Sequence, residues 1–326
     1  MFFNCKINEI WGINMNVIFG VDVGGTNIKF GKFKLNGPDY LVEKFLVETA
    51  VDKCGGNSVD MICDQIYDEV TKHLNGDNLI GVGVGIPGPV VNGVVLGAQN
   101  IKWGVVDLKA ELRKRFGNVD IEVLNDANAA TLGEWYFGAG EKLENAILIT
   151  LGTGVGGGII VNNHLIEGAT GSCGEIGHIK IFPYNGRKCS CGLEGCLEQY
   201  ASATGIVKTA KIQMIERGMP VDDELTCKEI FDRAKDGDDF YLEVVDKSAY
   251  FLATGLASIC NTLNPNVIMI GGGVSKSGDF FTARVRKIFR EMAFFSVKDT
   301  KIVVATLAND AGIYGNFAKV KLELND

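Results

Sequence analysis

Three cysteines and a histidine lie close together in the segment GHIKIFPYNGRKCSCGLEGCLE, residues 177–198. Cys189, Cys191 and Cys196 form the pattern C-x-C-x4-C, and His178 precedes the first cysteine by eleven residues. Three thiolates and one imidazole suit tetrahedral Zn²⁺, and four protein ligands leave no open position for an activated water. The spacing therefore predicts a structural zinc site. The alternative is three reduced thiols in a glycine-rich loop.

Two glutamates stand at the edges of this predicted metal site. Glu175 lies three residues before His178, and Glu198 lies two residues after Cys196. A metal that fixes the loop would also hold both carboxylates in place. We therefore expect the zinc to shape a loop that presents the acids, while the reaction itself uses other residues.

Two glycine-threonine turns have the composition of phosphate-binding loops. Residues 24–26 (GGT) follow a short apolar run at 17–22, and residues 152–154 (GTG) follow another at 146–151. Each run is predicted to be a strand, and a second strand is predicted after each turn. Exposed backbone N–H groups at such turns bind phosphate oxygens. The repeated pattern predicts two similar lobes.

The second turn also matches the dinucleotide-binding pattern G-x-G-x-x-G at Gly152, Gly154 and Gly157. That pattern requires a helix directly after the glycines, to receive the pyrophosphate. Here the residues 158–161 (GIIV) are predicted to continue as a strand, which disfavours a dinucleotide fold. The sequence contains no G-x-x-x-x-G-K-[ST], so a bound nucleotide would be held without a P-loop lysine.

One carboxylate has the position expected of a catalytic base. Asp126 and its neighbour Asn125 follow a predicted strand at 121–124 and precede a predicted helix at 127–135. Phosphoryl transfer to a hydroxyl group needs a carboxylate within hydrogen-bond reach of that hydroxyl. The alternative is a helix N-cap. Asp22, beside the first turn, would orient the water shell of Mg²⁺ on nucleotide phosphates, or else only cap the turn.

Strands and helices alternate along the chain, which predicts an α/β protein. The sequence has no low-complexity linker, so two lobes joined by a short hinge are expected. The expected division is an N-terminal extension at 1–16, a small lobe at 17–125 with the C-terminal helix 310–326, and a large lobe at 126–309 that contains the zinc loop 178–196. Further helices are predicted at 58–74, 107–116, 202–217, 226–235, 239–263 and 279–293, and further strands at 79–85, 267–270 and 302–305.

The composition excludes several classes of protein. Acidic residues outnumber basic ones by 40 to 32, the formal charge is −8, and no run of Lys or Arg offers a surface for nucleic acid. Nine cysteines without a disulfide framework favour a reducing, cytoplasmic location. No apolar run reaches the roughly 18 residues of a membrane span, and the N-terminal residues lack the pattern of a secretion signal.

Six motifs resemble those of the ROK family and occur in the same order. This family groups sugar kinases, repressors and open reading frames. They are DVGGTNIKFG at 22–31, LND at 124–126, LGTGVGGG at 151–158, GEIGH at 174–178, CSCGLEGCLE at 189–198 and GGGVS at 271–275. The resemblance extends from about residue 17 to the C-terminus. It implies a two-lobed, actin-like ATPase fold of the hexokinase type, with ATP and sugar bound in the cleft between the lobes.

The resemblance also implies an activity and a role for each matched residue. The expected reaction is the ATP-dependent phosphorylation of a hexose, most simply glucose to glucose 6-phosphate, with Mg²⁺ on the nucleotide. Asp126 would be the base. Sugar contacts are implied for Asn100, Asn125, Asp126, Glu175, His178 and Glu198. Nucleotide contacts are implied for Asp22, Gly24, Gly25, Thr26, Asn27, Lys29, Gly152, Thr153, Gly154, Gly271 and Gly272. Zinc ligation is implied for His178, Cys189, Cys191 and Cys196.

His178 is then assigned to both zinc and sugar. Its two ring nitrogens allow this, because one can coordinate the metal while the other donates to a hydroxyl group.

Alternatives within the family are kinases of N-acetylmannosamine, fructose or mannose, a polyphosphate donor, and a sugar-responsive repressor. A repressor carries a DNA-binding helix-turn-helix before the first motif, and the 21 residues before Asp22 are too few for one. A homodimer is expected from the family alone.

Overall fold

The structure is a computed structural model that describes residues 14–37, 40–51, 58–98 and 101–324. The chain forms two compact units. Unit 1 ends at Ala129 and resumes at Gly312, and unit 2 comprises Ala130–Ala311. The chain therefore leaves unit 1 within α4 (Asp126–Phe137) and returns at the start of α10 (Ala311–Glu323).

Unit 1 is built on a five-stranded mixed sheet in the order β3-β2-β1-β4-β8. Its strands are β1 (Asn16–Val23), β2 (Asn27–Lys34), β3 (Leu41–Glu48), β4 (Asn78–Ile86) and β8 (Asp120–Asn125). The first three strands are antiparallel neighbours, and β1, β4 and β8 are parallel neighbours. The parallel strands place three carboxyl ends at one edge of the sheet.

Unit 2 repeats this arrangement with a sheet in the order β11-β10-β9-β12-β13. Its strands are β9 (Ala146–Leu151), β10 (Val155–Val161), β11 (His164–Leu165), β12 (Val267–Gly271) and β13 (Lys301–Val304). Again the first three are antiparallel, and β9, β12 and β13 are parallel. The similarity that the two glycine-threonine turns predict therefore extends to the whole sheet.

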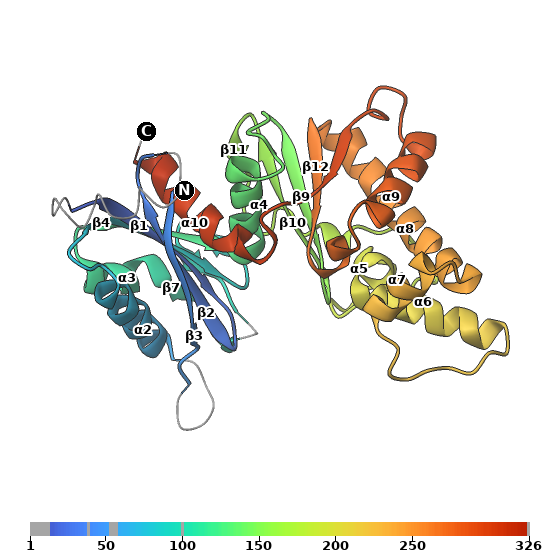
Figure 1. Ribbon diagram of the computed structural model, residues 1–326, viewed down its shortest axis with the longest axis horizontal. Coiled ribbons are helices and arrows are strands. Elements are labelled where there is room, and N and C mark those ends of the chain that lie inside the picture. Colours follow the sequence, from blue (N-terminus) through green and yellow to red (C-terminus); the bar gives the residue numbers. More distant parts are fainter. Residues whose placement is uncertain (1–13, 38–39, 52–57, 99–100, 325–326) are drawn as a thin grey trace. The chain divides into compact units, whose positions relative to one another are not determined.

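Helices cover both sheets, and Figure 1 shows them unit by unit. In unit 1, α2 (Val59–Lys72) and α3 (Leu108–Phe116) share a core with Val17, Phe19 and Val21 of β1. In unit 2, the helices that share a core with β9 and β12 are α5 (Glu198–Ala201), α6 (Ala203–Glu216), α7 (Cys227–Lys235), α8 (Asp239–Leu263) and α9 (Asp279–Met292). The shorter elements are β5 (Val90–Val91), β6 (Val94–Val95), β7 (Val106–Asp107), and the 3₁₀ helices η2 (Ile176–His178), η3 (Gly273–Ser277) and η4 (Ala308–Asp310).

The C-terminal helix α10 packs on the opposite face of the unit 1 sheet (Figure 1). A Cβ atom at Gly20 of β1 or Gly83 of β4 would overlap backbone atoms of α10. The Asn316 side chain of α10 donates a hydrogen bond to the carbonyl of Val21 (2.7 Å), and Phe317 stacks on Phe33 of β2. Glycines in two neighbouring strands thus let a helix lie directly on the sheet backbone.

The predicted helices begin at recognisable caps. The Ser58 hydroxyl accepts a hydrogen bond from the backbone N–H of Met61 at the start of α2. Thr226 and Glu229 form a capping box at the start of α7. None of the helices within the described residues is long and apolar enough to cross a membrane.

The sequence prediction places no element between residues 34 and 57, where the structure has β3. Alternate residues of β3 are partly buried, in the order Leu41, Glu43, Phe45 and Val47. This inward row includes a charged residue, which weakens the apolar alternation from which a strand is predicted. The structure corrects the prediction, because β3 pairs with β2 along its length.

A buried carboxylate ties α4 to the segment after β13. Glu134 of α4 is 1% exposed. Its Oε2 accepts hydrogen bonds from the backbone N–H groups of Thr306 (3.0 Å) and Ala139 (3.2 Å), and its Oε1 accepts one from the N–H of Leu307 (2.6 Å). All four residues belong to unit 2. The single buried side chain thus accepts hydrogen bonds from three backbone N–H groups.

Replacing Glu134 with alanine should lower the free energy of unfolding by about 1–3 kcal/mol, because it removes hydrogen bonds to a buried charged group. Urea denaturation followed by circular dichroism measures the loss.

The matched control for this variant is Glu141→Ala. Glu141 forms an ion pair with Lys301 at the surface, where both side chains are more than 40% exposed. Its removal should change the stability by less than about 1 kcal/mol. Equal effects of the two substitutions would contradict the structural role assigned to Glu134.

Candidate functional site

Two predicted functional carboxylates lie at one edge of the unit 1 sheet. Asp22 is near the carboxyl end of β1, and Asp126 directly follows β8. The strand between them, β4, is parallel to both and ends at Ile86. In α/β sheets, ligands bind outside the carboxyl ends of parallel strands. The sheet therefore brings both acids to the edge where a ligand is expected.

Asp126 is the first residue of α4, and its side chain is exposed. One carboxylate oxygen accepts hydrogen bonds from the N–H of Ala127 (2.8 Å) and from the Asn125 side-chain amide (3.0 Å). Asn125 also accepts from the N–H of Ala127 and Asn128 and donates to the carbonyl of Gly88. Asn125 therefore caps α4 and holds Asp126, and its contact with a sugar stays a prediction.

The charge of Asp22 is poorly solvated. Burial is the main reason that the pKa of Asp22 is raised to about 6, and the negative charge of Asp126 raises it further. Lys29, the register partner of Asp22 on β2, acts in the opposite direction. A buried carboxylate close to a second negative charge is typical of a site that receives a cation.

The first glycine-threonine turn is held by a residue that the sequence reading did not identify. Thr49, just after β3, donates its hydroxyl to the carbonyl of Gly24 (2.7 Å) and its N–H to the carbonyl of Thr26 (2.9 Å). The N–H of Gly24 donates to the carbonyl of Asn27 (2.9 Å). Recognising β3 in the sequence would have pointed to Thr49, because the strand ends beside the turn.

The second turn lies beside Gly271 and Gly272 at the corresponding edge of the unit 2 sheet. In the parallel register of β9 and β12, Thr150 is opposite Gly271. The turn closes with a hydrogen bond from the N–H of Gly152 to the carbonyl of Gly154 (3.0 Å). The Thr204 hydroxyl donates to the carbonyl of Thr153 (2.8 Å). The structure thus gathers the nucleotide residues expected in this unit.

Glu198 connects the second turn with the cysteine cluster. It is the first residue of α5, and its Oε2 accepts a hydrogen bond from the N–H of Val155, directly after the turn (3.2 Å). Its Oε1 lies 3.9 Å from the Sγ of Cys189. One carboxylate therefore faces both the expected phosphate loop and the expected metal site.

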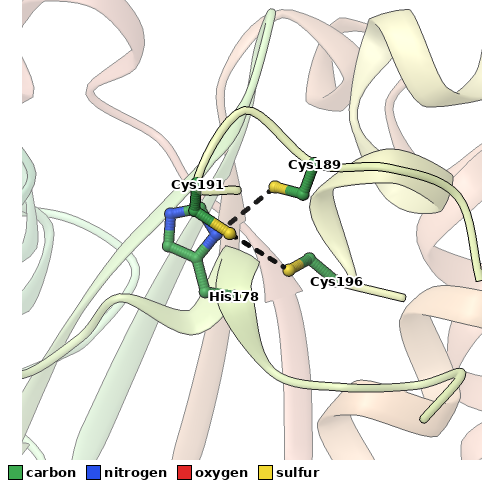
Figure 2. Close-up of side chains that lie close together, drawn as sticks. All are labelled: His178, Cys189, Cys191 and Cys196. Carbon is green, nitrogen blue, oxygen red and sulfur yellow. Dashed lines mark hydrogen bonds between the residues drawn. The ribbon is translucent and has the colours of Figure 1, made fainter. Parts of the chain in front are cut away.

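The four predicted zinc ligands converge in unit 2, and Figure 2 shows their side chains turned toward a common centre. All four ligand atoms lie within 4.8 Å of one another. The Nδ1 of His178 is 3.7 Å from the Sγ of Cys189, and the Sγ atoms of Cys191 and Cys196 are 3.6 Å apart. In tetrahedral zinc sites, Zn–S bonds of about 2.3 Å and Zn–N bonds of about 2.0 Å put ligand atoms about 3.5–3.8 Å apart. The donor set and its spacing therefore fit a zinc ion.

The two nitrogens of His178 point to different partners. Nδ1 faces Cys189, while Nε2 lies 3.9 Å from a carboxylate oxygen of Glu175. His178 ends the 3₁₀ helix η2, and Glu175 directly precedes that helix and is exposed. This geometry is compatible with the expected division, in which one nitrogen serves a metal and the other faces a ligand.

Short backbone pairings shape the cluster loop. Lys180 pairs with Cys196, and Lys188 pairs with Glu194, in antiparallel bridges. The N–H of Cys189 donates to the carbonyl of Leu193 (2.8 Å), which closes a tight turn around the C-x-C pair. The loop is therefore a small folded unit whose ligands approach one another across two antiparallel segments.

Arg187 attaches this loop to α5 and α6, and the sequence reading did not identify it. Its guanidinium donates to the carbonyls of Gln199 and Gly205 and to the hydroxyl of Thr209, and it lies over the ring of Tyr200. Burial lowers the pKa of Arg187. No local spacing signals this role, because the partners are helix carbonyls whose position depends on the tertiary fold.

The thiols differ in acidity. The pKa of Cys191 is lowered, first by a hydrogen bond from the backbone of Leu193, whereas burial raises the pKa of Cys196 to about 11. The pKa of Lys180 is raised, mainly by its hydrogen bond to Cys196. Thiols in such a cluster are expected to lose their protons when a metal binds.

The predicted residues thus form one group in each unit, and Asn100 lies outside the described residues. Unit 1 holds Asp22, Gly24, Gly25, Thr26, Asn27, Lys29, Asn125 and Asp126. Unit 2 holds Gly152, Thr153, Gly154, Glu175, His178, Cys189, Cys191, Cys196, Glu198, Gly271 and Gly272.

Known proteins resemble the chain over nearly its whole length. The sequence profile of the ROK family matches residues 18–323. A glucokinase from Halalkalibacterium halodurans is 41% identical over 321 residues, covering 94% of this chain and 95% of the relative. A xylose repressor from Caldicellulosiruptor bescii is 33% identical over 252 residues, covering 74% of this chain and 62% of the relative.

A solved structure also matches nearly the whole chain. The ROK family glucokinase from Streptomyces griseus, crystallised with glucose and AMPPNP, is 34% identical to this chain. It superimposes with a TM-score of 0.72, and the match covers 92% of this chain and 98% of the other.

Proposed function

Because the chain belongs to the ROK family, we propose that it transfers the γ-phosphoryl group of ATP to the 6-hydroxyl of glucose. Its mixed α/β units have the actin-like ATPase fold of ROK sugar kinases. The observation that carries the proposal is the 41% identity to a glucokinase over 94% of the chain. The bound glucose and AMPPNP of the Streptomyces griseus enzyme support both substrates.

Asp126 is the proposed catalytic base. Its carboxylate is exposed at the start of α4, beside Asn125. In phosphoryl transfer, a carboxylate that accepts the hydroxyl proton aligns the nucleophile with the phosphorus atom. Asn125 holds this carboxylate through its side-chain amide, so the hydroxyl of the sugar would meet an already oriented acceptor.

The two glycine-threonine turns are the proposed phosphate-binding loops. The N–H groups of Gly24 and Gly152 close the turns, so other amides of the turns would donate to the phosphate oxygens, and Gly271 and Gly272 would lie near the adenosine. Asp22 and Lys29 are adjacent in the register of β1 and β2. Asp22 would orient the water shell of Mg²⁺, and the ion would neutralise charge that develops on the phosphates.

The cysteine cluster is the proposed zinc site, because its donor set and spacing fit the ion. Zinc would cross-link the loop through these four side chains. His178 would then be fixed with one nitrogen free for the sugar, and Glu198 would be held between the cluster and the second turn. Glu175, beside His178, completes the proposed group of sugar-binding residues.

We also propose a cytoplasmic location. All seven described cysteines are free, which is usual in a reducing cytoplasm. A homodimer is proposed from the family resemblance.

A coupled assay of ADP release over a panel of sugars tests the reaction. Glucose should give the highest kcat/KM among glucose, mannose, fructose and N-acetylmannosamine, and ATP should exceed polyphosphate as the donor. Absence of turnover with every sugar, together with tight binding of a sugar and of DNA, would instead favour a repressor.

Binding of Mg-nucleotide should weaken as the pH falls below about 6. Protonation of Asp22, whose pKa is about 6, removes the negative charge that attracts the ion. At pH 5 about one tenth of the molecules retain the charge, so the affinity for Mg-AMPPNP should be about 10-fold lower than at pH 7.5. Isothermal titration calorimetry across this range measures the effect.

The control for this pH dependence is the Asp22→Asn variant. It retains the titration of the nucleotide itself but lacks the carboxylate. The difference between the two proteins isolates the contribution of Asp22, and identical pH profiles would exclude it.

A further inference from the structure

Lys180 lies against the proposed zinc ligands, although neither its position in the sequence nor its residue type marks it as a ligand. Its Nζ is 2.8 Å from the Sγ of Cys196. The hydrogen-bond partner of this ammonium group is therefore a sulfur atom rather than a carboxylate.

Backbone pairing brings these two residues together. Lys180 and Cys196 are directly opposite in an antiparallel bridge. Flanking hydrogen bonds join the N–H of Ile181 to the carbonyl of Gly195 (2.9 Å) and the N–H of Leu197 to the carbonyl of Ile179 (2.8 Å). Directly opposite residues project their side chains on the same side of the ladder. The pairing thus places the exposed Lys180 side chain on the same side of the ladder as the Cys196 thiol, within reach of its sulfur.

A count of charges shows why a cation is useful there. Three thiolates and a neutral imidazole around Zn²⁺ leave a net charge of −1. The carboxylate of Glu198, 3.9 Å from Cys189, adds a second negative charge at the cluster. Arg187 in the same loop donates to backbone carbonyls and to Thr209. Among the residues that the structure describes, Lys180 is the cation that hydrogen-bonds to a sulfur ligand.

We propose that Lys180 is a positioning residue for the metal, which donates a charge-assisted hydrogen bond to the Cys196 thiolate and offsets the negative charge of the zinc–thiolate cluster. This inference rests on the proposed zinc site and assigns a determinant of its affinity. Groups that hydrogen-bond to metal ligands commonly change the metal affinity by 10–100-fold. Donation to the thiolate also withdraws electron density from sulfur and makes it a weaker nucleophile.

The test compares the zinc affinity of the full-length wild type with that of Lys180→Met, Lys180→Arg and Lys208→Met, by competition with a chromophoric chelator. Lys180→Met keeps the length of the side chain but removes the charge and the donors, and should bind zinc about 10–100-fold more weakly. Lys180→Arg keeps the charge and the donors and should bind zinc more tightly than Lys180→Met. Lys208 on α6 donates to the Gln199 side chain (3.0 Å), so Lys208→Met controls for loss of one positive charge.

Alkylation gives a second readout that does not depend on enzyme activity. Zinc-loaded Lys180→Met should react faster with iodoacetamide than zinc-loaded wild type, since its thiolates lack the ammonium donor. The tetrahedral absorption bands of the Co²⁺-substituted variant show whether the cluster is still assembled. If assembled Lys180→Met matches wild type in zinc affinity and alkylation rate, the role of Lys180 is overturned. If wild type itself binds no stoichiometric zinc, the zinc site fails as well, so the two failures are distinguishable.

Discussion

Replacing Asp126 with asparagine should lower kcat for glucose phosphorylation by about 10²–10⁴-fold. The amide cannot accept the proton of the sugar hydroxyl, whereas it keeps a carbonyl oxygen that can cap α4 through the N–H of Ala127. The KM for glucose should change much less than kcat, because the contacts of the other sugar-binding residues remain. Steady-state kinetics with an ADP-coupled assay measure both constants.

The matched control is Asp107→Asn, which makes the same change at the start of another helix. The Asp107 side chain accepts from the N–H of Ala110 at the start of α3 (2.9 Å) and lies outside the proposed catalytic group. Its kcat should equal that of wild type. Wild-type turnover in Asp126→Asn would reject the base assignment.

The Asp126 variant has a second, independent signature. The charge of Asp126 helps to raise the pKa of Asp22, so its removal should move the weakening of Mg-nucleotide binding to a lower pH. This shift would show that the two carboxylates share one site even if kcat were limited by product release.

Replacing Cys191 with serine should abolish stoichiometric zinc binding and weaken glucose binding by about 10-fold or more. A weaker ligand in the set of four lowers metal affinity, and the loop then no longer fixes His178 and Glu198. Metal analysis should give about one zinc per wild-type chain and much less in the variant. Calorimetry with glucose measures the binding loss.

Cys227→Ser is the control for the loss of a thiol. Cys227 is the first residue of α7, is partly buried, and lies outside the cluster of ligand atoms. Its zinc content and glucose affinity should match those of wild type. A metal-free wild-type protein with undiminished glucose affinity would contradict the proposed role of the metal.

Local spacing explains which parts of the site could be foreseen. The C-x-C-x4-C pattern and His178 lie within nineteen residues, and such short loops bring their members together whatever the rest of the chain does. The two glycine-threonine turns and Asp126 were placed at strand ends because apolar runs precede them. The α/β class, the family and the repeated sheet were therefore accessible from the sequence, and the structure and the comparisons confirm them.

Residues that act through distant partners could not be foreseen in the same way. Arg187 binds carbonyls of α5 and α6, and Thr49 binds a turn that lies more than twenty residues earlier. Strand β3 was not predicted because a charged residue, Glu43, lies in its inward-facing row. There the Oε1 of Glu43 lies 2.9 Å from the Nδ1 of His73. Such roles depend on the register between strands and on helix packing, which no short pattern in this sequence encodes.

The return of the chain to unit 1 has a consequence for biosynthesis. Helix α10 lies directly on the glycine-containing strands β1 and β4, yet the ribosome makes it only after all of unit 2. During translation, one apolar face of the unit 1 sheet therefore stays uncovered while unit 2 can already fold. This face is covered only when residues 311–323 emerge, so a nascent chain that stalls before that point is expected to be prone to aggregation.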